Sequence, residues 1–237
     1  MTKLHRRDLK QDEVRTKVAE AVKSVSLHGR EVVYIILAVV AVAGIAIAWF
    51  FYERSQQQAS QDLLGTALEK FNAPVAQQVD PNMPKPAYNF NSETEKYTAA
   101  VKDFEKVAAD YGNTPAADMA RYLSGVCYFY LKDYGKAEQN LKQSVKVSDR
   151  NILYYQSRLA LADLYNKTNR PQQAIDVLNE ALKPSKAQVP KEFLLLQLAQ
   201  SYEKAGKTKE AKDTYQKIVT EYKESPVSFE AQQKLNE

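Results

Sequence analysis

The chain has 237 residues, 44% of them hydrophobic and 26% charged, which is typical of one folded domain with room for an additional segment. Its single cysteine excludes a disulfide framework within the chain and any metal site built from several cysteines. Both histidines, His5 and His28, lie in the first 30 residues, and the net charge of +4 includes no basic stripe, so neither a histidine-based active site downstream nor nucleic-acid binding is expected.

Residues 1–31 form a basic N-terminal segment with eight Lys and Arg residues against five Asp and Glu residues. Valines at 14, 18, 22 and 25 recur at helical spacing, which predicts a short amphipathic helix over residues 10–27. Two interpretations stay open for it. The segment either contacts anionic lipid or a membrane partner, or it is a solvated tail that only sets the orientation of the chain.

Residues 32–52 run through VVYIILAVVAVAGIAIAWFFY without a charge. As a helix this stretch is about 31 Å long, close to the thickness of the hydrocarbon core of a bilayer. Tyr34 near one end and Trp49 and Tyr52 near the other suit the two membrane interfaces. The stretch therefore predicts a transmembrane helix. A cleaved signal peptide is the alternative, disfavoured by the long leading segment and by the aromatic residues that follow Ala48.

The distribution of Lys and Arg around this helix predicts its orientation. Eight basic residues precede it, whereas only Arg54 and then Lys70 follow it closely. Basic residues are retained on the cytoplasmic side, so we expect a cytoplasmic N-terminus and a C-terminal part on the opposite side of the membrane.

Residues 53–91 contain a predicted helix and a proline-rich insert. Ser60 to Phe71 is expected to be the leading helix of a first repeat, and the insert follows over residues 72–91 with four prolines. Proline interrupts helices, so the insert is expected to be extended. It is interpreted either as a surface loop or as a segment that fills a groove or docks a partner.

Residues 92–237 repeat with a period of 37 residues. A small residue is followed three positions later by a tyrosine, and an alanine is followed four positions later by a bulky side chain. The small residues are Gly125, Ala162 and Ala199, and the tyrosines are Tyr128, Tyr165 and Tyr202. The alanines are Ala100, Ala137, Ala174 and Ala211, and the bulky residues are Phe104, Leu141, Leu178 and Tyr215.

This pattern predicts one pair of antiparallel helices per repeat. The small residue lets the two helices approach, and the tyrosine fills the crevice between them. Turns are expected at residues 132–135, 168–171 and 205–207, and helix boundaries at Pro115, Pro184, Pro190 and Pro226. Residues 225–236 are expected to form a closing helix.

The pattern Gly125, Tyr128, Ala137 and Leu141 resembles the tetratricopeptide repeat family, from whose usual period of 34 residues the chain departs. The fold class implied is all-α, with a single N-terminal transmembrane helix followed by an α-solenoid of helix hairpins. Such solenoids bind polypeptides on a concave face formed by the leading helices. Matching positions give a predicted binding face of Met119, Tyr122, Val126, Phe129, Leu159, Asp163, Asn166, Phe193, Leu196 and Gln200.

This predicted binding face is apolar and aromatic in its first part and more polar later. It lacks the basic cluster with which some members of the family hold a terminal carboxylate, so that role is not expected. An amphipathic helix or an unfolded apolar segment would suit it better. The alternative is that several of these side chains are simply buried between neighbouring repeats.

No phosphate-binding glycine loop, nucleophile elbow or HExxH motif occurs in the sequence. We therefore expect no enzymatic activity, cofactor, metal site or small-molecule substrate. Cys127 is expected to be a small core residue.

The layout as a whole resembles the YfgM-like family, ancillary subunits of the bacterial SecYEG translocon. This resemblance implies a single-pass protein of the bacterial inner membrane, with a periplasmic repeat domain that binds the translocon, chaperones or unfolded clients. The alternative function is a structural scaffold that joins subunits of an envelope complex. A mitochondrial outer-membrane import receptor is a third possibility, disfavoured by the basic N-terminal flank.

Overall fold

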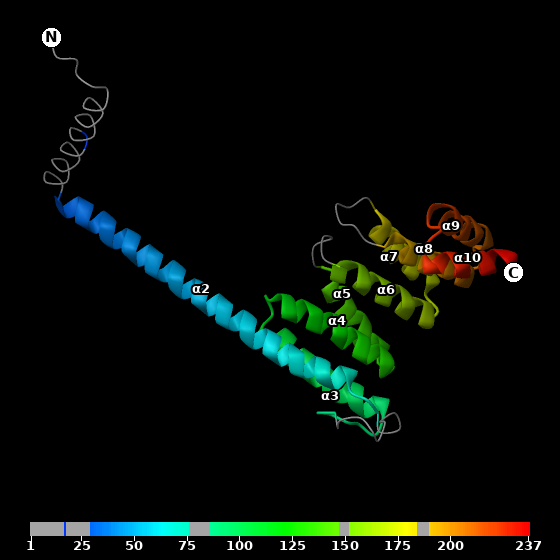
Figure 1. Ribbon diagram of the computed structural model, residues 1–237, viewed down its shortest axis with the longest axis horizontal. Helices are drawn as coiled ribbons and strands as arrows, with labels where there is room; N and C mark the ends of the chain where they lie inside the picture. The colour runs from blue at the N-terminus through cyan, green and yellow to red at the C-terminus, as the bar shows by residue number, and fades with distance from the viewer. Residues whose placement is uncertain (1–16, 18–28, 76–85, 147–151, 184–189) are drawn as a thin grey trace, which may run out of the picture. The chain divides into compact units, whose positions relative to one another are not determined.

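The computed structural model describes residues 17, 29–75, 86–146, 152–183 and 190–237. Over these residues it is all-α, with nine helices and one isolated β-bridge (Figure 1). The chain divides into two compact units, Met1–Ser55 and Gln56–Glu237. Except for Lys17, which is helical, the amphipathic helix predicted over residues 10–27 lies outside the described residues.

The first helix, α2, runs from Gly29 to Asn72 and contains the apolar stretch of residues 32–52. By length and composition it is the one helix among the described residues that could cross a membrane, and the large side chains of its apolar stretch are exposed. The helix predicted from Ser60 to Phe71 is the C-terminal end of α2 rather than a separate element. The charged residues Glu53 and Arg54 end the uncharged stretch, but neither residue type interrupts a helix, so α2 continues through them.

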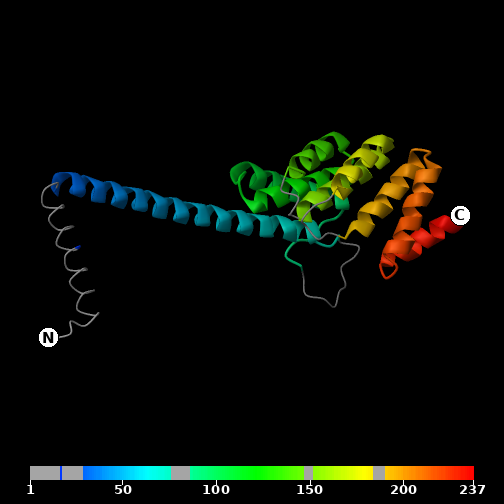
Figure 2. The same cartoon turned by 90° about the horizontal axis from the view of Figure 1, so that it is seen from above.

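The Gln56–Glu237 unit is a series of helix hairpins. The end of α2 packs against α3, Glu93–Asp110, where Phe71 contacts Tyr97 and Phe104 with ring centroids 5.7 and 6.0 Å apart. The remaining helices follow as α4 (Pro115–Tyr130), α5 (Tyr134–Ser144), α6 (Ile152–Lys167), α7 (Pro171–Leu182), α8 (Lys191–Lys204), α9 (Thr208–Glu221) and α10 (Pro226–Asn236). Figure 2 shows the hairpins side by side in chain order, from green to red.

The residues that define the 37-residue period are the core of these hairpins. Ala100, Ala137, Ala174 and Ala211 and their bulky partners four residues later are all buried, and so are Gly125, Ala162 and Ala199. A Cβ atom placed on Gly125 would lie 2.6 Å from Cγ of Leu141, so α4 and α5 approach more closely there than any side chain allows. The burial of the small and bulky residues predicted from the repeat is confirmed. Of the tyrosines, Tyr128 and Tyr165 are buried and Tyr202 is half-buried.

All three turns inside the repeats have the same backbone conformation. Lys132, Asn169 and Gly206, each 37 residues apart, have φ values of +62°, +57° and +72°. The next N–H then donates to the carbonyl oxygen of the repeat tyrosine, as from Lys207 to Tyr202 at 2.9 Å. Helix α5 begins at Tyr134, so Tyr134 and Gly135, expected in the first turn, belong to the helix.

Prolines begin helices at the predicted boundaries. Pro115, Pro171 and Pro226 occupy the first positions of α4, α7 and α10, where the missing N–H costs no hydrogen bond. Pro190 is the residue before α8, whereas Pro184 lies outside the described residues. The closing helix is present as α10, which buries Val227 and Ala231 against α8 and α9.

Only the two ends of the proline-rich insert are described. Val75 pairs with Phe90 in the isolated parallel bridge, and the Lys70 ammonium lies 5.3 Å from the ring centre of Tyr88. The middle of the insert, residues 76–85, lies outside the described part of the chain. The surface-loop and groove-filling interpretations of the insert both concern these residues.

Candidate functional site

The predicted binding face is distributed over the leading helices of three successive repeats. Helix α4 carries Met119 to Phe129, α6 carries Leu159 to Asn166, and α8 carries Phe193 to Gln200. These helices contact one another in the order α4, α6, α8, and α8 also contacts α10. The sequence pattern therefore assigns the ten residues to helices that are neighbours in space.

Most of these side chains are partly accessible. Phe193 is 45% exposed and Asp163 is exposed, whereas seven are half-buried: Met119, Tyr122, Val126, Phe129, Leu159, Leu196 and Gln200. Burial raises the pKa of the Tyr122 hydroxyl, and the neighbouring Tyr130 raises it further. Tyr122 is therefore a neutral aromatic group at any physiological pH.

Asn166 differs from the other nine residues because its side chain is only 7% exposed. Its Nδ2 donates to Oγ of Ser201 on α8 at 2.8 Å, and that hydroxyl donates to the carbonyl oxygen of Gln197 at 2.7 Å. A buried polar group requires such a partner. Asn166 therefore joins the third repeat, α6 and α7, to the fourth repeat, α8 and α9. This agrees with the alternative interpretation, in which residues of the predicted binding face are buried between neighbouring repeats.

The polar end of the face is closed by α10. Nε2 of Gln200 donates to Oε1 of Glu230 at 3.1 Å, and both side chains lie toward solvent. Exposed hydrogen bonds of this kind contribute little to stability and exchange readily with water. Helix α8 therefore presents both the exposed ring of Phe193 and an exchangeable polar group at Gln200.

Tyr130 on α4 is an exposed aromatic residue that the sequence pattern did not select. Its ring stacks on Tyr97 of α3 with centroids 4.7 Å apart and planes at 8°, and it meets Phe129 edge to face at 5.9 Å. Tyr130 remains 53% exposed. In the sequence, the only signal for Tyr130 was its place next to Phe129 at the end of an aromatic-rich helix. The family pattern does not include this position.

The described residues contain no group of three or more His, Cys, Asp or Glu that could hold a metal ion. Cys127 is completely buried, and this burial raises the pKa of its thiol to about 12, an effect that the charge of Lys96 opposes. A thiol with that pKa stays protonated near neutral pH and is not a nucleophile. Cys127 acts as a core residue between α3 and α4.

A family profile described as a tetratricopeptide repeat-like domain matches residues 30–237 of the chain. Two crystal structures of Podosopora anserina putative kinesin light chain nearly identical TPR-like repeats are similar to it at 18% identity. The first covers 73% of this chain and 92% of its own with a TM-score of 0.47, and the second covers 70% and 88% with a TM-score of 0.45. No protein with a curated description matches the sequence.

Proposed function

Because the chain belongs to the tetratricopeptide repeat-like domain family, we propose that it is a membrane-anchored module that binds segments of other polypeptides on the predicted binding face. The proposal assigns it no chemical reaction. The resemblance to ancillary translocon subunits supports a finer version, in which the repeats lie in the periplasm and receive chains or chaperones near a translocon.

The accessibility of large apolar side chains on the leading helices carries this proposal. Phe193 on α8 is exposed, and Tyr122 and Phe129 on α4 are half-buried. Both helices belong to the row of leading helices α4, α6 and α8. Helix α6 contacts both α4 and α8, and its Leu159 is also half-buried, so accessible apolar side chains recur along this row of helices, as they do at protein interaction sites. Their aromatic character suits the apolar side of an amphipathic helix or an unfolded segment.

The apolar stretch of α2 supports the membrane-anchored part of the proposal. Anchoring would confine the repeats to the vicinity of the membrane and raise the effective concentration of a partner that is also held there. A face of modest affinity would then suffice for binding. The basic residues of the 1–31 segment support a cytoplasmic N-terminus and, with it, repeats on the opposite side.

The test uses the full chain in lipid nanodiscs mixed with a chemically denatured protein diluted from urea. We expect the chain to delay aggregation, measured by light scattering, and we expect Phe193→Glu and Tyr122→Glu to abolish the delay because a charge would have to be desolvated on binding. Phe229→Glu is the matched control, since Phe229 on α10 is 72% exposed and lies outside the predicted binding face.

A structural scaffold is the alternative function, and the same experiment separates the two. A scaffold would leave aggregation unchanged and would recover a stoichiometric partner from detergent-solubilised membranes. Thermal unfolding of each variant must accompany the assay, because half-buried Tyr122 also packs against the core. Equal loss of activity in Phe229→Glu and Phe193→Glu would contradict the assigned face.

A further inference from the structure

The predicted binding face continues toward the C-terminus as a group of carboxylates. Three of its positions recur one period later as glutamates: adding 37 to Asn166, Phe193 and Gln200 gives Glu203, Glu230 and Glu237. The first glutamate lies on α8, the second lies on α10, and the third caps the C-terminal end of α10. We call these three glutamates the acidic end of the face, and all three are exposed.

A hydrogen bond and the helical periodicity bring the acidic end together in space. Gln200 precedes Glu203 by three residues, so the two share one face of α8, and Gln200 donates to Glu230 on α10 at 3.1 Å. Glu237 follows Glu230 by seven residues, about two helical turns. Helices α8, α9 and α10 also contact one another (Figure 2). The three carboxylates are therefore neighbours on adjoining helices.

The acidic end keeps a net negative charge. Nζ of Lys234 pairs with Glu237 at 2.7 Å, whereas among the described residues no ion pair includes Glu203 or Glu230. The pKa of the Lys234 ammonium is raised, chiefly by its hydrogen bond to Glu237 and also by the charges of the other two glutamates. Lys204 follows Glu203 and is exposed, but within the described part of the chain it pairs with none of the three. One ammonium thus lies among three carboxylates.

A buried hydroxyl faces the acidic end. Tyr215 of α9 is 1% exposed, and its hydroxyl makes no hydrogen bond of regular geometry with any described residue. Burial raises the pKa of this hydroxyl. Glu203, through its charge and a contact short of regular hydrogen-bond geometry, raises it further, as do the charges of Glu230 and Glu237. Buried polar groups nearly always have a partner, so this hydroxyl indicates that a polar group is missing beside it.

The arrangement suits a basic side chain. The described residues contain no group of carboxylates placed to hold a metal ion. A lysine ammonium has three donors and an arginine guanidinium five, so either can reach oxygens that come from different helices. Hydrogen bonds between such a cation and a carboxylate are stronger than those between neutral groups. Charge complementarity therefore favours a partner with a basic residue at this position.

We propose that the acidic end binds a lysine or arginine side chain of the polypeptide segment held on the predicted binding face. Glu203 and Glu230 are the acceptors, since neither has a cation of its own, and the Tyr215 hydroxyl adds a third oxygen beside them. An apolar residue of the same segment packs on Phe193, ten residues before Glu203 on α8 and about 15 Å away along the helix. The inference rests on the proposed function, because it names the chemistry of the same partner.

The test compares three fluorescent peptides that share one amphipathic sequence. Two positions at the end of the apolar side hold lysine in the first peptide, glutamine in the second and glutamate in the third. Fluorescence anisotropy measures their binding to the full chain in nanodiscs of neutral lipid, and empty nanodiscs give the background. We expect the lysine peptide to bind about fivefold or more tightly than the glutamine peptide at low salt, and the glutamate peptide to bind most weakly. High salt should reduce this preference.

Variants locate the cation site. Combining Glu203→Gln with Glu230→Gln should remove the preference for lysine and leave the affinity for the glutamine peptide unchanged. Both glutamates are exposed, and a glutamine at 230 still offers an oxygen to Gln200, so the double variant should fold normally, which thermal unfolding checks. Asp213→Asn is the matched control. It removes one negative charge from α9, where Asp213 is exposed, and should leave the preference for lysine unchanged.

Equal affinity of the lysine and glutamine peptides for the unchanged chain would overturn the inference, and so would a preference for lysine that survives in the double variant. Failure of the proposed function would look different. No peptide would bind, or Phe193→Ala, which leaves the charge of the face unchanged, would not weaken binding of the glutamine peptide. Equal affinities that are both lost in Phe193→Ala would support the proposed function and refute the cation site.

Discussion

Single residues set how closely the helices of this protein approach. The clearest case is Gly125, where the neighbouring helix leaves no space for a side chain because Leu141 fills it. The corresponding residues in the next repeats, Ala162 and Ala199, are also buried but carry a methyl group. Of the three repeats, the second therefore leaves the least room for a side chain at the position three residues before the tyrosine.

Gly125→Ala should destabilise the folded chain. The added Cβ would overlap Leu141 and force α4 away from α5, which costs about 1–3 kcal/mol in packed cores. Urea unfolding followed by circular dichroism measures this loss. The control is Gly65→Ala in α2, where nothing lies within 4 Å and the better helix propensity of alanine should stabilise the helix by up to about 1 kcal/mol. Equal effects of the two substitutions would contradict the close approach.

Lys132→Gly should stabilise the chain, since Lys132 has a left-handed backbone that a non-glycine residue adopts at a cost of about 1 kcal/mol. The turn hydrogen bond from Asp133 N–H to the Tyr128 carbonyl oxygen would be retained. Gly206→Ala at the equivalent turn should have the opposite effect. The midpoints of urea unfolding for both variants check the expectation, and a lower midpoint for Lys132→Gly would refute it.

At the scale of helices, successive repeats are joined by polar contacts as well as by apolar packing. Glu138 on α5 accepts a hydrogen bond from Arg170 Nη1 at 2.8 Å and another from the Tyr165 hydroxyl of α6 at 3.2 Å. Lys142 adds an ion pair at 2.6 Å. The second and third repeats therefore share a charged network around a partly buried carboxylate.

This network predicts a pH-dependent contribution to stability. Burial by itself raises the pKa of the Glu138 carboxyl, but hydrogen bonds and charges from Lys142 and Arg170 outweigh it, so the pKa is lowered from its ordinary value of 4.5. A lowered pKa in the folded state means that the stabilisation is complete above the unfolded value and is lost as the pH falls through the folded value.

We expect wild type to exceed Glu138→Gln in free energy of unfolding at pH 7, and the difference to shrink progressively below pH 4.5. Denaturant unfolding at a series of pH values measures it. Glu180→Gln, whose carboxylate pairs with Lys183 in solvent, serves as the control and should show a much smaller difference. A difference for Glu138→Gln that stays constant with pH would show that its charge is not the cause.

At the scale of the whole molecule, the function that we propose requires the repeats and the basic N-terminal segment to lie on opposite sides of a membrane. Protease added to spheroplasts of a bacterium that expresses the chain should digest the repeat domain and leave a protected N-terminal fragment. Antibodies against tags at both ends would report the two parts on blots. Survival of the C-terminal part in intact spheroplasts, together with its digestion after lysis, would refute this topology.

Much of this fold could be predicted from the sequence because the same packing requirement recurs in three repeats. Each hairpin places the same kinds of residue in the same surroundings: a small residue, a tyrosine three positions later, and an alanine with a bulky partner. Because all of them recur with one period of 37 residues, the sequence indicates the helix pairs. Proline and glycine marked helix starts and turns for local backbone reasons. Hydropathy alone likewise identified the apolar stretch within α2.

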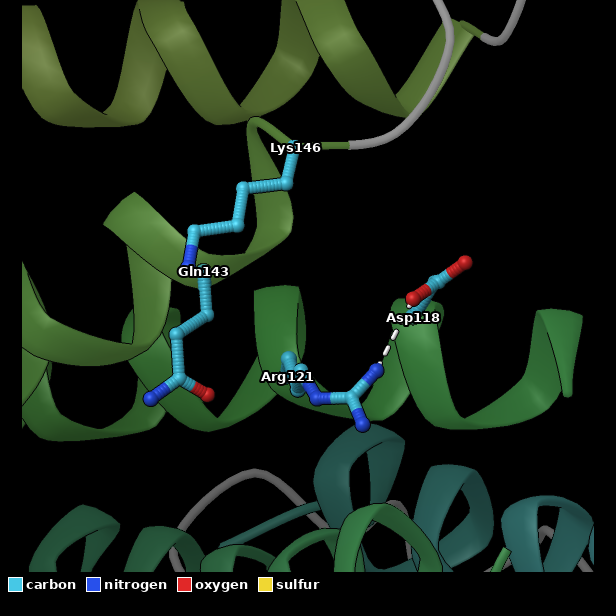
Figure 3. A pocket seen from close by; sticks show the side chains of 4 residues that line it. All are labelled: Asp118, Arg121, Gln143 and Lys146. Atoms are coloured by element: carbon cyan, nitrogen blue, oxygen red, sulfur yellow. Dashed lines mark hydrogen bonds and ion pairs between the residues drawn. The ribbon is translucent and has the colours of Figure 1, made fainter. Parts of the chain in front are cut away.

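Only the tertiary structure could decide what depends on residues distant in the sequence. Asn166 is buried because Ser201, 35 residues later, accepts its hydrogen bond, and Tyr130 is held by Tyr97 of the preceding repeat. Asp118 and Arg121 of α4 line one pocket together with Gln143 of α5 and Lys146 (Figure 3). A periodic pattern fixes which side chains fill the shared core, whereas contacts unique to one pair of repeats depend on how those two repeats meet in space.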